Sequence, residues 1–137
     1  MREIKFRAVR LDTVEWIYGD LHLHSPFPHI HSTRGDKAKI DTNTIGQFTG
    51  LRDKNGKEVY EGDILRGDEY PFNSDGVDNY FAEIVWADNV CGFYRITRKK
   101  PNSTVRGISH GNFSELDDED IKSFEVIGNI HDNPELL

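Results

Sequence analysis

The chain has 137 residues, a length that suits one ordinary domain or two very small ones. Only 36% of the residues are hydrophobic, so the eight Phe, five Tyr and two Trp must supply much of a lean core. The net charge of −7 argues against sequence-independent nucleic-acid binding, which requires a basic face. A single cysteine excludes an internal disulfide framework and fits a reducing compartment. With no signal-peptide pattern and no stretch approaching roughly 18 apolar residues, the sequence predicts a cytoplasmic protein.

The first forty residues predict a hairpin followed by a long loop. Ile4, Phe6 and Ala8 alternate with charged residues, which is typical of a strand. The aromatic run of residues 16–18 then predicts a second strand that pairs back on the first. From His22 to Asp41 the chain is rich in His, Ser, Thr and Gly and is interrupted by prolines, so we expect a loop with one short strand around Ile30.

The middle of the chain gives the clearest hairpin signal. Asn55-Gly56 stands between two β-prone runs, and both residues tolerate the positive φ angles of a tight turn. Residues 61–63, Glu-Gly-Asp, predict a sharp turn in which Gly62 and Asp63 shape and cap the backbone, followed by a strand over 64–66. A catalytic carboxylate pair of Glu61 and Asp63 is the alternative interpretation.

The last part of the chain predicts a second hairpin, one helix and a final strand. Residues 80–86 form a strand with apolar residues on both faces, which suits a central position in a sheet. Residues 92–97 return as its partner after a turn at 88–89, and residues 67–79 and 101–111 are expected to be loops. A helix of one or two turns is predicted over 117–121 and a strand over 123–130.

Several short strands joined by Gly- and Asn-rich turns favour a mostly β fold, a small barrel or roll with at most one short helix. The predicted core consists of large apolar side chains spread over these strands. They are Phe6, Trp16, Phe48, Leu51, Val59, Ile64, Ile84, Trp86, Phe93, Val126 and Ile127.

Four blocks of sequence carry a family resemblance: residues 1–7, 15–21, 44–64 and 125–137. In this order they resemble the phage-associated YopX family from end to end, so residues 1–137 are expected to be one YopX-like domain. The resemblance implies an SH3-like barrel over 44–137, with an N-terminal hairpin and His-rich loop over 1–43. It also implies a phage or prophage origin, and therefore the cytoplasm of a bacterial host. It brings no catalytic residues.

The His-rich loop is the first candidate site. His22, His24, His29 and His31 form two His-x-His pairs, and alternate strand residues share a face, so these imidazoles could bind Zn or another transition metal. The alternative is a polar strand face followed by a solvated loop, with no cofactor.

A basic segment is the second candidate site. Arg95, Arg98, Lys99, Lys100 and Arg106 lie beside Phe93 and Tyr94, the combination that a single-strand nucleic-acid groove uses. The acidic residues of 115–120 follow and could neutralise it, and a solvated hairpin end is the alternative interpretation.

Three functional hypotheses follow from the sequence. The first is a non-enzymatic module that binds a protein partner from the host or the phage. The second is a nucleic-acid-binding accessory protein that uses Arg95 to Arg106. The third is a metal-dependent enzyme that uses the loop from His22 to His31. The lack of a recognisable catalytic motif favours a protein that is not an enzyme, and self-association through a sheet edge is a further option.

Overall fold

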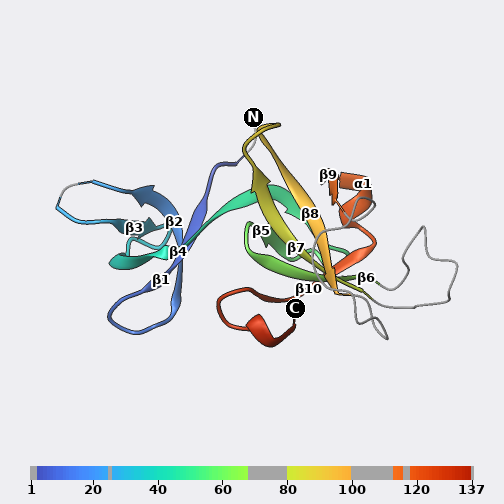
Figure 1. Ribbon diagram of the computed structural model, residues 1–137. Helices are drawn as coiled ribbons and strands as arrows, with labels where there is room; N and C mark the ends of the chain where they lie inside the picture. The colour runs from blue at the N-terminus through green and yellow to red at the C-terminus, as the bar shows by residue number, and fades with distance from the viewer. Residues whose placement is uncertain (1–2, 25, 68–79, 100–112, 116–117, 137) are drawn as a thin grey trace, which may run out of the picture. The chain divides into compact units, whose positions relative to one another are not determined.

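A computed structural model describes residues 3–24, 26–67, 80–99, 113–115 and 118–136 (Figure 1). The chain divides into two compact units, unit 1 over Met1–Gly50 and unit 2 over Leu51–Leu137. Two antiparallel sheets account for most of the described residues, which confirms the mostly β prediction. No helix in the described ranges is long and apolar enough to span a membrane.

Unit 1 is a ring of four antiparallel strands: β1 (Phe6–Arg10), β2 (Trp16–His22), β3 (His29–Ser32) and β4 (Lys37–Arg52). The strands pair in the order β1-β2-β3-β4, and β4 also pairs with β1, so each strand has a neighbour on both sides. In Figure 1 these strands, coloured blue to cyan, wind around one another. The subdivision predicted at Thr44 lies inside β4, which runs from unit 1 into unit 2.

An irregularity in β4 allows the ring to close. The β1–β4 register shifts between Arg7 and Val9. There the Thr44 hydroxyl accepts a hydrogen bond from the Val9 backbone N–H at 2.8 Å and donates one to the Asp41 carbonyl at 2.6 Å. A side chain therefore replaces the backbone partner that the bulge removes, and the strand can bend without leaving a buried amide unsatisfied.

The interior of unit 1 is narrow. Its buried side chains come from alternate positions of the four strands: Ala8, Ile17, Ile30, Ala38 and Ile40, with Phe6, Leu21 and Ile45 packed against them. At Gly19 in β2 the neighbouring strand comes so close that an added Cβ would overlap the His31 carbonyl oxygen. Only glycine fits this position, because the obstacle is backbone that cannot turn away.

Unit 2 contains a five-stranded sheet in the order β10-β6-β7-β8-β9. β7 therefore lies in its centre, as the sequence predicted. The elements of this unit are β5 (Glu58–Tyr60), β6 (Asp63–Gly67), β7 (Tyr80–Ala87), β8 (Gly92–Lys99), β9 (Phe113–Glu115), α1 (Asp118–Ile121), β10 (Phe124–Asn129) and a 3-10 turn, η1 (Pro134–Leu136).

The core of unit 2 lies on one face of this sheet. Its buried members are Val59, Leu65, Ile84, Ile121, Phe124 and Val126, with Leu51 and Phe93 packed against them. The single turn of α1 contributes Ile121, which is fully buried. The predicted helix, which the sequence placed over 117–121, thus exists over Asp118–Ile121 and acts as a lid on the core.

Asp53 joins the β4–β5 turn to β10. One carboxylate oxygen accepts the backbone N–H groups of Asn55 and Lys57, both at 2.9 Å, which organises the predicted Asn55-Gly56 turn. The other accepts the backbone N–H of Val126 at 2.8 Å, and the Lys54 N–H donates to the Phe124 carbonyl. The outer edge of β10 is therefore covered by a side chain and a turn.

The second predicted turn is also confirmed. The Asp63 carboxylate accepts the backbone N–H of Tyr60 at 2.7 Å, and Asp63 is buried. Gly62 has a φ of 91°, which non-glycine residues rarely adopt. Asp63 thus caps the turn, as we expected from the sequence.

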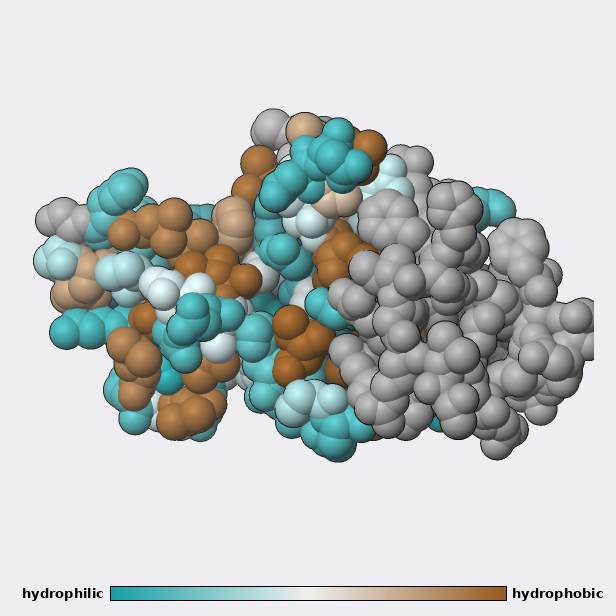
Figure 2. Space-filling model, viewed as in Figure 1, coloured by the Kyte–Doolittle hydropathy of each residue, from teal (hydrophilic) through white to brown (hydrophobic). Residues whose placement is uncertain are grey.

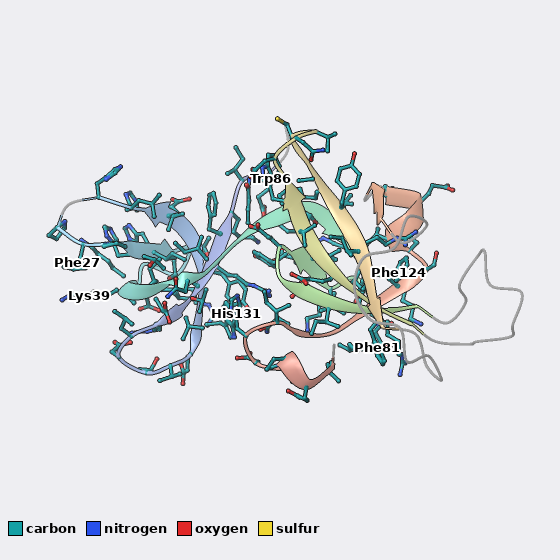
Figure 3. All side chains as sticks on the ribbon, in the orientation of Figure 1. Phe27, Lys39, Phe81, Trp86, Phe124 and His131 are labelled. Carbon is teal, nitrogen blue, oxygen red and sulfur yellow. The ribbon has the colours of Figure 1, made fainter. Side chains whose placement is uncertain are left out.

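Three sequence predictions are wrong in detail. The expected loop up to Asp41 ends at Asp36, because β4 begins at Lys37 and its Ala38 and Ile40 enter the core. Trp86 is 40% exposed instead of buried, because it lies at the end of β7, where it packs edge-on against Phe93 (Figure 3). The sequence also missed the short strand β9. The predicted loops over 68–79 and 101–111 lie outside the described residues.

Candidate binding site

The tip of the β1–β2 hairpin in unit 1 exposes large apolar side chains. Five residues, 11–15, connect the strands, and the Val14 N–H donates to the Arg10 carbonyl at 3.1 Å, which closes the turn. Leu11 is 60% exposed and Val14 is 77% exposed. Neither side chain is buried in the core, so their apolar character is not explained by folding.

Val14 also has an unfavourable backbone conformation. Its φ is 62°, in the left-handed region that a β-branched residue adopts only at a cost of about 1–2 kcal/mol. Asn or Gly would occupy this turn position without that cost. Backbone strain of this kind is concentrated at functional positions, and here it coincides with the most exposed large apolar side chain of the described residues.

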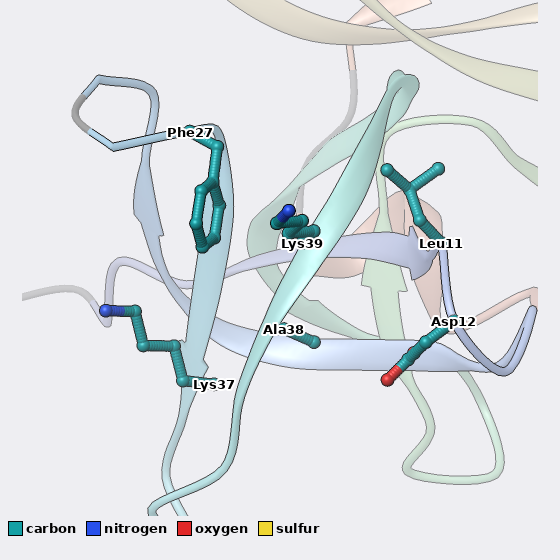
Figure 4. Close-up of a pocket in the computed structure, with 6 residues that line it drawn as sticks. All are labelled: Leu11, Asp12, Phe27, Lys37, Ala38 and Lys39. Carbon is teal, nitrogen blue, oxygen red and sulfur yellow. The ribbon is translucent and has the colours of Figure 1, made fainter.

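A hollow of about 500 Å³ lies next to this hairpin tip (Figure 4). We call it the unit 1 hollow, and it is lined by Leu11, Asp12, Phe27, Lys37, Ala38 and Lys39. The beginning of β4 crosses it, with Phe27 from the segment before β3 on one side and Leu11 from the hairpin on the other. Its volume falls in the range of about 300–1,000 Å³ that ligand sites occupy.

The aromatic side of the hollow is held in place from several directions. The Lys39 ammonium lies over the Phe27 ring, 4.4 Å from its centroid. The Phe27 carbonyl lies 2.9 Å from His29 Nδ1, and the neighbouring Pro28 carbonyl accepts the Ile40 N–H at 3.3 Å. Figure 3 shows Phe27 and Lys39 at this end of unit 1. These contacts preorganise the ring, which lowers the entropy lost when a ligand packs on it.

The charges in the hollow are unbalanced. Arg10 binds Asp12 through two hydrogen bonds, Nε to Oδ1 at 3.0 Å and Nη2 to Oδ2 at 2.9 Å, and these hold the pKa of Asp12 at about 2. Within the described part of the chain, neither Lys37 nor Lys39 forms an ion pair with a carboxylate. The acid is therefore already neutralised, and the hollow presents two positive charges without counter-ions.

Two of the four candidate histidines stack on each other, and metal binding by the four stays a prediction. His22 and His29 face each other across β2 and β3, with ring centroids 4.7 Å apart and planes within 2° of parallel. Ring nitrogens bind a metal through lone pairs in the ring plane, and parallel planes do not direct two lone pairs to one point. His24 and His31 are exposed, and no group of three or more His, Cys, Asp or Glu side chains in the described ranges could hold a metal.

The basic segment is only partly described. Arg95 is 6% exposed, with its guanidinium 4.9 Å from the centroid of the Phe124 ring in the core of unit 2. Arg98 and Lys99 belong to β8, while Lys100 and Arg106 lie outside the described residues. Arg95 therefore has a place in the packing of unit 2, and the segment's role in nucleic-acid binding stays a prediction.

Sequence reasoning missed the unit 1 hollow, because it assigned residues 22–41 to a loop. The signal was present in Lys37-Ala38-Lys39-Ile40, where charged and apolar residues alternate with the period of a strand. The pattern was too short to stand out beside the His- and Pro-rich sequence before it. Nothing in the sequence placed Leu11 beside Lys39, a proximity that follows from the β1–β4 pairing.

Comparisons with known proteins place the chain among its relatives. A family model described as YopX protein matches residues 5–137. A crystal structure of protein EF1440 from Enterococcus faecalis is similar, with 26% sequence identity and a TM-score of 0.60. The similarity covers 100% of this chain and 99% of that one. No curated protein matches the chain.

Proposed function

The chain belongs to the YopX family, and from that premise we propose that it is a non-enzymatic module that binds another protein. The proposal includes a phage or prophage origin, a place in the cytoplasm of the bacterial host, and a partner from the host or the phage. It also retains an SH3-like barrel for the C-terminal part of the chain. The binding surface that we assign to it is the hairpin tip of unit 1 together with the unit 1 hollow.

One observation carries this proposal: the hairpin tip combines exposure with strain. Leu11 and Val14 are exposed, and Val14 adopts a left-handed conformation that reduces stability. An exposed apolar pair beside a preformed hollow is typical of protein–protein contact, because burial of such side chains supplies binding energy of roughly 25 cal/mol per Å². In Figure 2 apolar side chains, coloured brown, lie among hydrophilic ones on the visible face of unit 1.

The closed ring determines the mode of contact. Each of β1 to β4 already pairs on two sides, so none of these four strands is a free edge of the ring. The contact that we propose therefore uses side chains at the tip and in the hollow. Such a surface on a rigid scaffold needs little rearrangement on binding.

Site-specific photo-crosslinking tests this function. A benzophenone amino acid at position 14 should give a discrete crosslinked protein in the bacterium that carries this chain, and Leu11→Asp should abolish it. The matched control is the same amino acid at position 89, an exposed site in the four-residue β7–β8 turn of unit 2. If no discrete product forms at position 14, or if the same product forms at position 89, the proposed function is refuted.

A further inference from the structure

We propose that the unit 1 hollow recognises an extended, acidic segment of the partner protein that carries an apolar side chain beside its carboxylates. This inference rests on the proposed function and adds the chemistry of the partner. It is carried by the two lysines, by the apolar walls on either side of them, and by the charge distribution of the chain.

Lys37 and Lys39 favour a negatively charged ligand. Lys37 and Lys39 are separated by one residue in β4, so their side chains leave the same face of the strand about 7 Å apart. Both side chains are exposed, and the Lys39 ammonium contacts the face of Phe27, not a carboxylate. Two carboxylates at alternate positions of an extended peptide have the same spacing, about 7 Å, and can pair with both ammonium groups.

The walls of the hollow favour an apolar side chain in the ligand. Phe27 lies on one side of β4 and Leu11 on the other (Figure 4). The Leu11 N–H donates to the Lys39 carbonyl at 3.0 Å, so Leu11 and Phe27 flank the same point of β4. A Leu or Phe side chain of the partner fits between them, next to the carboxylate that pairs with Lys39.

The distribution of charge favours this end of the chain for an acidic ligand. Unit 1 has seven Lys and Arg residues against six Asp and Glu residues, whereas unit 2 has ten against eighteen. An acidic segment is repelled by unit 2 and not by unit 1, which directs it to the hollow. Asp12 does not oppose it, because Arg10 neutralises that carboxylate.

Fluorescence anisotropy with synthetic peptides tests the inference on the full-length protein. The probe is a labelled peptide Ser-Glu-Ser-Glu-Ser-Leu-Ser-Gly, compared with one in which both Glu are Gln and one in which Leu is Ala. Only the first should bind, and more weakly as salt increases. The variant with both Lys37→Glu and Lys39→Glu should bind roughly tenfold more weakly, which corresponds to about 1.4 kcal/mol. Lys57→Glu, an exposed change in unit 2, should leave binding unchanged.

Three results would overturn the inference. The first is equal binding of the Gln peptide, and the second is binding that survives reversal of both lysines. The third is binding of a labelled ten-nucleotide thymidine oligomer, but of none of the peptides, that depends on Lys37 and Lys39; the ligand would then be a nucleic acid. If the position 14 crosslink forms while no peptide binds, the protein-binding function stands and only the acidic partner is refuted.

Discussion

Substitution of Asp53 by Asn should destabilise unit 2 much more than the same change at the exposed Asp88. The change preserves the size of the side chain but replaces one acceptor oxygen by an NH2 group. The carboxylate accepts three backbone N–H groups, two in the β4–β5 turn and one from Val126 in β10. The amide cannot accept all three, because one of its two ends now donates.

The size of the loss follows from the burial of these groups. Asp53 is 5% exposed, and the N–H of Val126 is buried, so an unsatisfied N–H there costs about 1–3 kcal/mol. Asn55 and Lys57 are exposed, so water can replace the carboxylate and each bond accounts for about 0.5 kcal/mol. The single oxygen of Asn still accepts on one of these two sides, so the loss in the free energy of unfolding is about 1–3 kcal/mol.

Urea unfolding measures this loss if the signal comes from unit 2 alone. A Trp16→Phe background leaves Trp86 as the single tryptophan, and Trp86 packs on Phe93 in unit 2. Asp88→Asn, an exposed change in the β7–β8 turn, is the control and should alter stability by less than about 0.5 kcal/mol. If Asp53→Asn lowers stability by no more than this control does, the carboxylate does not organise the turn and β10 as we have argued.

Three further predictions concern unit 1. Gly19→Ala should prevent native pairing of β2 with β3, because the new Cβ overlaps the backbone of β3. Hydrogen exchange of the β2 amides should then become fast, and unchanged protection of these amides would contradict the close approach of the two strands. Val14→Asn should raise the free energy of unfolding by about 1 kcal/mol in thermal denaturation by relieving the left-handed conformation, whereas Val90→Asn, in a turn residue without positive φ, should give no gain. The pKa of Asp12 is lowered from 3.8 to about 2, so the stability that its pair with Arg10 contributes is complete above pH 3.8 and is lost as the pH falls through about 2. Carboxyl NMR should show a titration midpoint of Asp12 at about pH 2, and Arg10→Gln should return the pKa of Asp12 toward its ordinary value.

Local turn chemistry allowed much of the fold to be predicted from the sequence. Asn55-Gly56, Gly62 and Asp63 specify their turns through backbone preferences and short-range hydrogen bonds, which depend on neighbours in the chain. The start of β4 was not predictable in the same way. Lys37 to Ile40 become a strand through pairing with β3 and β1, and those partners are distant in sequence.

The candidate site depends even more on long-range pairing. Leu11, Phe27 and Lys39 come from three separate segments, and only closure of the ring brings them to one hollow. The sequence predicted the histidine and basic clusters as candidate sites because their members are neighbours along the chain. In the structure His29 supports Phe27, and Arg95 packs on Phe124.

The bond between Asp53 and Val126 has a consequence for the order of folding during synthesis. The two residues are 73 positions apart, so the β4–β5 turn lacks one of its partners until β10 has left the ribosome. Unit 1 ends at Gly50, and the strand pairs that form its ring lie before that point. Because compact units fold as their segments emerge, unit 1 can be complete while unit 2 is still an unfinished sheet with an open edge beside β6. Nascent chains tethered to the ribosome by a shorter or a longer C-terminal linker, which keeps β10 inside the exit tunnel or places it outside, should therefore have a unit 1 that is equally resistant to protease. Unit 2 should be resistant only with the longer linker.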